Sequence, residues 1–106
     1  MAIPDHRETL PLQSIYDEAG YLDQMPFDVF RELMTHVSEE LGVPSGKLRP
    51  SDRFDAELAP ARGNEFDSGV AMLAYDLKLA AKRHKRKLDM SVETLDGYLR
   101  LMSELY

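Results

Sequence analysis

With 106 residues, of which 43% are hydrophobic and 30% are charged, the chain has the size and composition of one domain with a packed core and a well-solvated surface. It contains no cysteine, which excludes disulfides and thiolate chemistry, and no apolar run approaches the roughly 20 residues needed to cross a bilayer. We therefore expect a cytoplasmic protein without a membrane partner. The formal net charge is -6, and because the chain is acidic outside the basic run of residues 82–87, we do not expect nucleic acid as a partner.

Residues 1–26 are interrupted by three prolines, which break any long helix: Pro4, Pro11 and Pro26. A short helix is predicted over residues 13–22, with Ile15 and Leu22 on one side. We treat residues 1–26 as an N-terminal arm and residues 27–106 as a helical bundle.

The first long helix is predicted over residues 26–42. Apolar side chains recur there at steps of three and four, which places them on one helical stripe: Phe27, Phe30, Met34, Val37 and Leu41. Pro26 suits a helix start, and Gly42 followed by Pro44 gives a stop signal.

A long loop is predicted over residues 43–66, which hold three prolines and two glycines. Loops of this length in compact domains are usually held by apolar side chains. The candidates are Leu48, Phe54, Leu58 and Phe66. Among these we favour Phe54 as the main anchor.

Two further helices are predicted in the C-terminal half. The first begins at Ser68, a helix-capping residue type, and ends in the basic run, where cations complement the helix dipole. Its stripe consists of Val70, Leu73, Leu77, Ala80 and Ala81. The last helix begins near Ser91, and its stripe consists of Val92, Leu95, Leu99 and Met102. The sequence therefore predicts a small all-α bundle of three to four helices.

Few residues have the spacing of a catalytic or metal site. His36 has Glu39 and Glu40 nearby, a group that is more often a solvated helix face than a metal site, so no metal is expected. The carboxylates of Asp52 and Asp55 lie in the predicted loop, where nothing in the sequence indicates the burial that general acid catalysis needs. We do not expect an enzyme. Helical spacing also predicts core positions for three methionines: Met34, Met72 and Met102.

The most informative stretch is residues 66–73, where Ser68 follows a long loop and opens a helix. A phosphate attached to this serine would lie beside free backbone amides at the positive end of the helix dipole. The commoner role of such a serine is simply to cap the helix.

The order of these features resembles that of the acyl and peptidyl carrier proteins over about residues 27–105. In those proteins a first helix ends in a segment like Leu41-Gly42-Val43, and the following loop contains an inward aromatic residue, as in the segment from Leu48 to Phe54. The second helix opens with an Asp-Ser pair, here Asp67-Ser68. The last helix begins at a pair like Thr94-Leu95. Gly69 stands where typical carriers have leucine, and the loop is several residues longer, with residues 59–64 as the insertion.

The resemblance implies that Ser68 accepts 4'-phosphopantetheine from a phosphopantetheinyl transferase, and that the thiol arm carries an acyl or aminoacyl group between partner enzymes. Asp67 would help to present the serine. Gly69, Val70 and Met72 would contact partners.

Two alternatives use the same helices without a prosthetic group. One is a helical protein-interaction module for an unidentified protein partner. The other uses the basic run of residues 82–87 to bind an anionic partner, with affinity that falls steeply with salt.

Overall fold

A computed structural model of the chain describes residues 3–4, 6–58, 69–83 and 92–105. These residues form four α-helices and one 3₁₀ helix: α1 (Leu12–Ala19), α2 (Phe27–Leu41), η1 (Ser45–Lys47), α3 (Gly69–Arg83) and α4 (Leu95–Leu105). They contain no β-strand, so the predicted all-α fold is confirmed. Among them, no helix combines the length and the apolar character that a membrane span requires.

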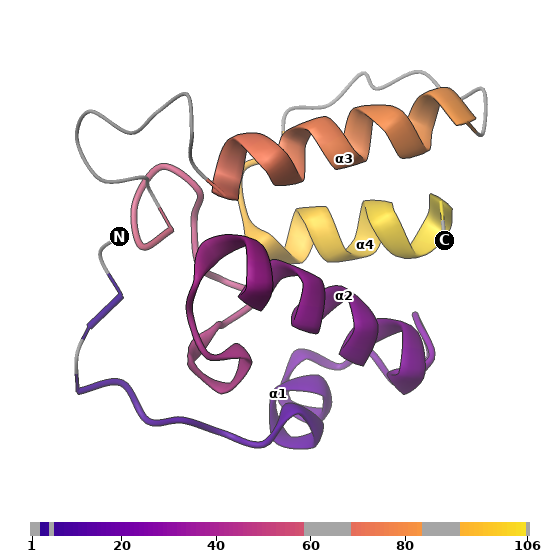
Figure 1. Ribbon diagram of the computed structural model, residues 1–106. Helices are drawn as coiled ribbons and strands as arrows, with labels where there is room; N and C mark the ends of the chain where they lie inside the picture. Colours follow the sequence, from indigo (N-terminus) through magenta and orange to yellow (C-terminus); the bar gives the residue numbers. More distant parts are fainter. Residues whose placement is uncertain (1–2, 5, 59–68, 84–91, 106) are drawn as a thin grey trace.

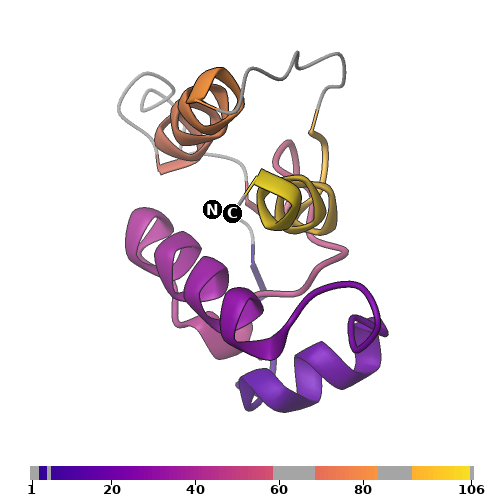
Figure 2. The same ribbon diagram turned by 90° about the vertical axis from the view of Figure 1, so that its right-hand side faces the viewer.

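Three helices pack around one core. In Figure 1, α2, α3 and α4 lie side by side, and α2 runs opposite to α3 and α4. Figure 2, turned by 90°, shows α4 nearly end-on and places α1 on the outer side of α2. The bundle is therefore α2, α3 and α4, with α1 as an added layer.

The segment before α2 is part of the packed structure. The predicted short helix is present as α1, but Gly20 ends it early in the left-handed conformation, with φ of 73°. Ile15, Tyr16 and Tyr21 are buried. The prediction that Leu22 shares the side of Ile15 is wrong, because the chain leaves the helical path at Gly20, and the side chain of Leu22 is 76% exposed.

Aromatic rings join this segment to the start of α2. The ring centroids of Tyr16 and Phe30 lie 5.3 Å apart, and those of Tyr21 and Phe30 lie 5.7 Å apart. The buried Tyr16 hydroxyl donates a hydrogen bond of 2.6 Å to the carbonyl of Met25. The Tyr21 hydroxyl donates to the carboxylate of Asp96 in α4. Residues 12–25 thus contact both α2 and α4.

The helix α2 agrees with its prediction. Pro26 occupies the N-cap, and Gly42 ends the helix in the left-handed conformation, with φ of 68°. The buried side chains of this helix are Phe30, Leu33, Met34 and Val37. Phe27 and Leu41 pack at the edge of the core, at the two ends of the predicted stripe.

The predicted loop is held by apolar side chains, but Phe54 is not its main anchor. Leu48 and Leu58 are fully buried, whereas Phe54 is only half-buried, with its ring centroid 6.5 Å from that of Tyr98. The reason is that the Phe54 backbone pairs with the chain just before α4, which keeps its side chain at the edge of the bundle. Phe66 and the insertion at residues 59–64 lie outside the described residues.

This pairing also fixes the start of α4. The amide of Phe54 donates to the carbonyl of Glu93 at 2.9 Å, and the amide of Leu95 donates to the carbonyl of Asp52 at 2.9 Å. The Thr94 hydroxyl accepts a hydrogen bond of 3.2 Å from the amide of Gly97, as an N-cap residue does. The helix therefore begins at Leu95, later than predicted, and Ser91 lies outside the described residues.

A buried ion pair connects the N-terminal segment to the loop. The Arg7 guanidinium donates to the carboxylate of Asp52 at 2.7 Å and to the carbonyl of Lys47 at 3.0 Å. Asp52 also accepts a hydrogen bond of 2.9 Å from the backbone amide of Arg49. The Asp52 side chain is 2% exposed, and one of its carboxylate oxygens accepts both of these hydrogen bonds.

Candidate functional site

The serine singled out by the sequence directly precedes α3 in the chain. The helix begins at Gly69, the residue after Ser68, and runs for 15 residues to Arg83. Asp67 and Ser68 themselves lie outside the described residues, as does the side chain of Val70. The described part of the candidate site is therefore the helix that follows the serine.

One side of α3 faces the core and another carries exposed apolar side chains. Leu73 and Leu77 are buried against α2 and α4, as predicted. Met72, Tyr75 and Leu79 are 47%, 56% and 41% exposed. Their spacing of three and four residues places them on one stripe of the helix, which we call the α3 apolar stripe.

The prediction that Met72 belongs to the core is wrong. Successive residues of an α-helix point about 100° apart, so Met72 and the buried Leu73 face different directions. The prediction for Met34 is confirmed, since it is fully buried, and Met102 is partly buried at the edge of the core. Met72 is thus available on the surface, near the start of the helix.

Cations lie at the other end of the α3 apolar stripe. Lys82 and Arg83 are exposed, and Arg83 follows Leu79 by four residues, which puts it on the same side of the helix. Residues 84–87 of the basic run lie outside the described residues. The visible surface of α3 therefore begins apolar and ends basic.

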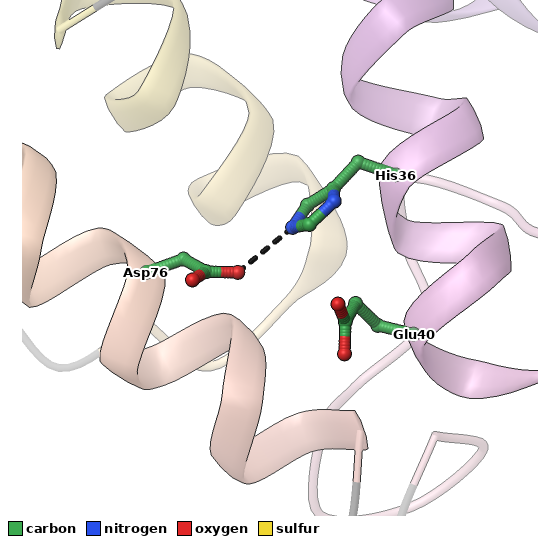
Figure 3. A group of neighbouring side chains, drawn as sticks. All are labelled: His36, Glu40 and Asp76. Carbon is green, nitrogen blue, oxygen red and sulfur yellow. Dashed lines mark hydrogen bonds and ion pairs between the residues drawn. The ribbon is translucent and has the colours of Figure 1, made fainter.

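A second group of polar side chains lies between α2 and α3. His36 and Glu40 are one turn apart on α2, and Asp76 approaches them from α3 (Figure 3). The Nε2 atom of His36 lies 2.8 Å from an Asp76 carboxylate oxygen, and one ligand atom from each of the three residues lies within 4.8 Å of the other two. We call this group the α2–α3 triad.

The triad differs from the group that the sequence suggested. His36 was considered with Glu39 and Glu40, but Glu39 is exposed and only Glu40 belongs to the triad. Asp76 was missed because it is 40 residues from His36 in the chain. No local signal identifies Asp76, because its partner becomes apparent only when α3 is placed against α2.

The buried tyrosine of α4 is an electrostatic neighbour of the triad. The Tyr98 side chain is 1% exposed, and its hydroxyl has no hydrogen-bond partner within the described segments. Burial raises the pKa of Tyr98, and the negative charges of Asp76 and Glu40 raise this pKa further. All three bundle helices therefore contribute polar groups to one region.

The loop carboxylates considered for acid catalysis are engaged in ion pairs. Asp52 is buried, contrary to expectation, but it binds Arg7. Asp55 is exposed, and its hydrogen bond with Arg53 lowers its pKa. An acid catalyst requires the opposite shift, so Asp55 does not have the environment of one, and the Asp52 carboxylate is occupied by its ion pair with Arg7.

No protein-family model matches the chain, and neither a curated protein nor a solved structure shows significant similarity to it. The structure defines a small all-α protein. Its helix α3 follows Ser68 in the chain, carries an exposed apolar stripe and ends in basic residues.

Proposed function

We propose that the chain is a divergent acyl or aminoacyl carrier protein, with 4'-phosphopantetheine attached to Ser68. The carrier itself does not catalyse. In the modification step, the Ser68 oxygen attacks the phosphorus of coenzyme A that bears the pantetheine arm. The new P–O bond replaces the pyrophosphate bond, adenosine 3',5'-bisphosphate leaves, and a base of the transferase takes the serine proton.

The observation that carries this proposal is the match between helix ends and the sequence features of carriers. α2 ends at Leu41 with Gly42 as its cap, the described helix α3 starts at Gly69, the residue next to Ser68 in the chain, and α4 begins directly after Thr94. The acyl-carrier-like arrangement of the bundle is part of the proposal, and this order of helix ends supports it.

The chemistry of a helix start also favours a phosphodiester at this serine. The first amides of a helix have no partner within the helix, and the aligned peptide dipoles place partial positive charge there. α3 is 15 residues long, enough for a well-developed dipole. A phosphate on Ser68 would therefore be stabilised by the helix that follows.

The α3 apolar stripe supplies a surface on which a partner enzyme can dock. Met72 lies one turn from the start of the helix, so an enzyme that handles the thioester arm can contact it at the same time. Lys82 and Arg83 at the far end favour partners with an acidic rim. Because Gly69 stands where typical carriers have leucine, the transferase has one fewer apolar side chain to contact next to Ser68.

The same stripe also favours a second candidate function. Three exposed large apolar side chains on one helix suit a protein-interaction module that carries no prosthetic group. Such a module binds its partner through Met72, Tyr75 and Leu79 whatever stands at residue 68.

Intact-mass analysis after incubation with coenzyme A and a broad-specificity phosphopantetheinyl transferase separates the two functions. A carrier gains one phosphopantetheinyl group, Ser68→Ala gains none, and Ser51→Ala, which changes an exposed serine of the loop, is modified like the wild type. Modification of Ser68→Ala, or no modification of the folded wild type by a panel of transferases, would refute the carrier proposal and leave the interaction module.

A further inference from the structure

The α2–α3 triad offers a mixed set of metal-ligand atoms. Imidazole nitrogen and carboxylate oxygen are both zinc ligands, and open zinc sites combine three protein ligands with a further coordination position for water. We propose that His36, Glu40 and Asp76 form a binding site for one divalent transition-metal ion of the zinc class, which bridges α2 and α3.

The geometry is close to what such an ion needs. Zinc binds imidazole nitrogen and carboxylate oxygen at about 2.0 to 2.2 Å, so neighbouring ligand atoms of a tetrahedral site lie about 3.4 Å apart. The His36–Asp76 separation of 2.8 Å must widen slightly, while the others, at up to 4.8 Å, close by rotation of the side chains. Because His36 and Glu40 are one helical turn apart, α2 presents both at a fixed spacing.

The balance of charge favours a cation. Two carboxylates meet one histidine, and within the described part of the chain Glu40 forms neither a hydrogen bond nor an ion pair. Glu40 is half-buried, where an unpaired negative charge is costly. A divalent ion neutralises both carboxylates and replaces the single His36–Asp76 hydrogen bond with three coordination bonds.

Tyr98 provides an independent reason to expect a ligand here. A buried hydroxyl without a hydrogen-bond partner in the described segments loses the hydrogen bonds that water would have given it. The helix that carries Tyr98, α4, packs against both α2 and α3, the two helices of the triad.

The ion can reach the site from solvent. The side chains of His36 and Asp76 are 38% and 28% exposed, so exchange needs no unfolding. The imidazole ligand selects zinc-class ions over magnesium and calcium, which prefer an all-oxygen shell. The proposal does not depend on the modification of Ser68.

Calorimetric titration of the full, untagged chain with Zn²⁺ tests the site. The expected result is one ion per chain, with affinity that falls about tenfold or more in His36→Ala, Glu40→Gln and Asp76→Asn. Two matched controls should bind like the wild type: Glu39→Gln changes the exposed neighbour of Glu40, and His6→Ala changes an exposed histidine that does not belong to the triad. Ser68→Ala should also keep the site, which separates this result from the carrier test.

Glu40→Gln is the decisive variant, because it removes no hydrogen bond of the described structure and is nearly the same shape. Circular dichroism checks that it remains folded. A wild type that takes up no Zn²⁺ with one-to-one saturation would overturn the proposal, and so would binding that all three triad variants leave unchanged.

Discussion

Removal of the Arg7 guanidinium tests whether the N-terminal segment is part of the stable fold. Arg7→Met keeps most of the aliphatic length of the side chain but leaves the Asp52 carboxylate, 2% exposed, without its cation. The carbonyl of Lys47 loses the hydrogen bond from the same guanidinium. We expect the single substitution Arg7→Met to cause a large loss of stability.

The size of the loss follows from the burial of the pair. Removing one member of a fully buried ion pair costs about 3 to 5 kcal/mol. Arg7 is 17% exposed, and Asp52 keeps the hydrogen bond from the Arg49 amide, so water and backbone compensate part of this cost. We therefore expect Arg7→Met to lower the free energy of unfolding by about 2 to 3 kcal/mol, which corresponds to a fall in Tm of roughly 10 °C for a domain of this size.

Urea unfolding followed by circular dichroism measures this difference. Arg31→Met is the matched control, because Arg31 is 59% exposed and lies 3.9 Å from Asp28, so its loss should change stability by less than about 0.5 kcal/mol. The double variant Arg7→Met/Asp52→Asn should lose less than the sum of the single variants. An Arg7→Met protein as stable as the Arg31→Met control would refute the docked position of the N-terminal segment.

Three more outcomes are expected. Gly97→Ala should raise stability by up to about 1 kcal/mol in thermal unfolding, because Gly97 lies inside α4 and its added Cβ would make only ordinary contacts, the nearest at 3.6 Å. Gly46→Ala should lower stability by about 1 to 3 kcal/mol in the same assay, since the new Cβ would lie 2.5 Å from the backbone oxygen of Leu10. Burial raises the pKa of both Tyr21 and Tyr98. The folded state therefore keeps protons that the unfolded state releases as the pH rises above about 10, the ordinary pKa of tyrosine. Urea unfolding at increasing pH should show full stability below about pH 10 and a loss of stability above it. Replacing either tyrosine with phenylalanine should flatten that loss.

The elements that the sequence predicted well are those whose signals are local. α2 has a regular apolar period, with Pro26 before it and Gly42 after it, and its bounds agree with the prediction. The start of α4 was placed too early because Val92 continues the apolar period of the helix. The Thr94-Leu95 pair, which the resemblance to carrier proteins placed at the helix start, is the better signal, and backbone pairing of Leu95 with Asp52 holds that start in place.

The candidate site divides in the same way. The position of Ser68 before a helix follows from local signals, whereas the exposure of Met72 depends on how α3 is rotated against its neighbours. The triad needs His36 and Asp76 to come together from two helices, and the sequence gives only the half of it that lies on α2. Contacts between distant segments require the tertiary structure.

The backbone pairing between Phe54 and Glu93 closes a loop of about 40 residues that contains the whole of α3. Bringing the ends of such a loop together costs on the order of 3 kcal/mol of chain entropy. Once Phe54 and Glu93 are paired, this entropy is already lost, and α3 docks on the bundle with both ends of its loop held in place. If α3 detaches from the bundle while the Phe54–Glu93 pairing remains, it can dock again without a second cost in loop-closure entropy. Amide hydrogen exchange can follow this motion, as faster exchange in α3 than at Phe54 and Leu95.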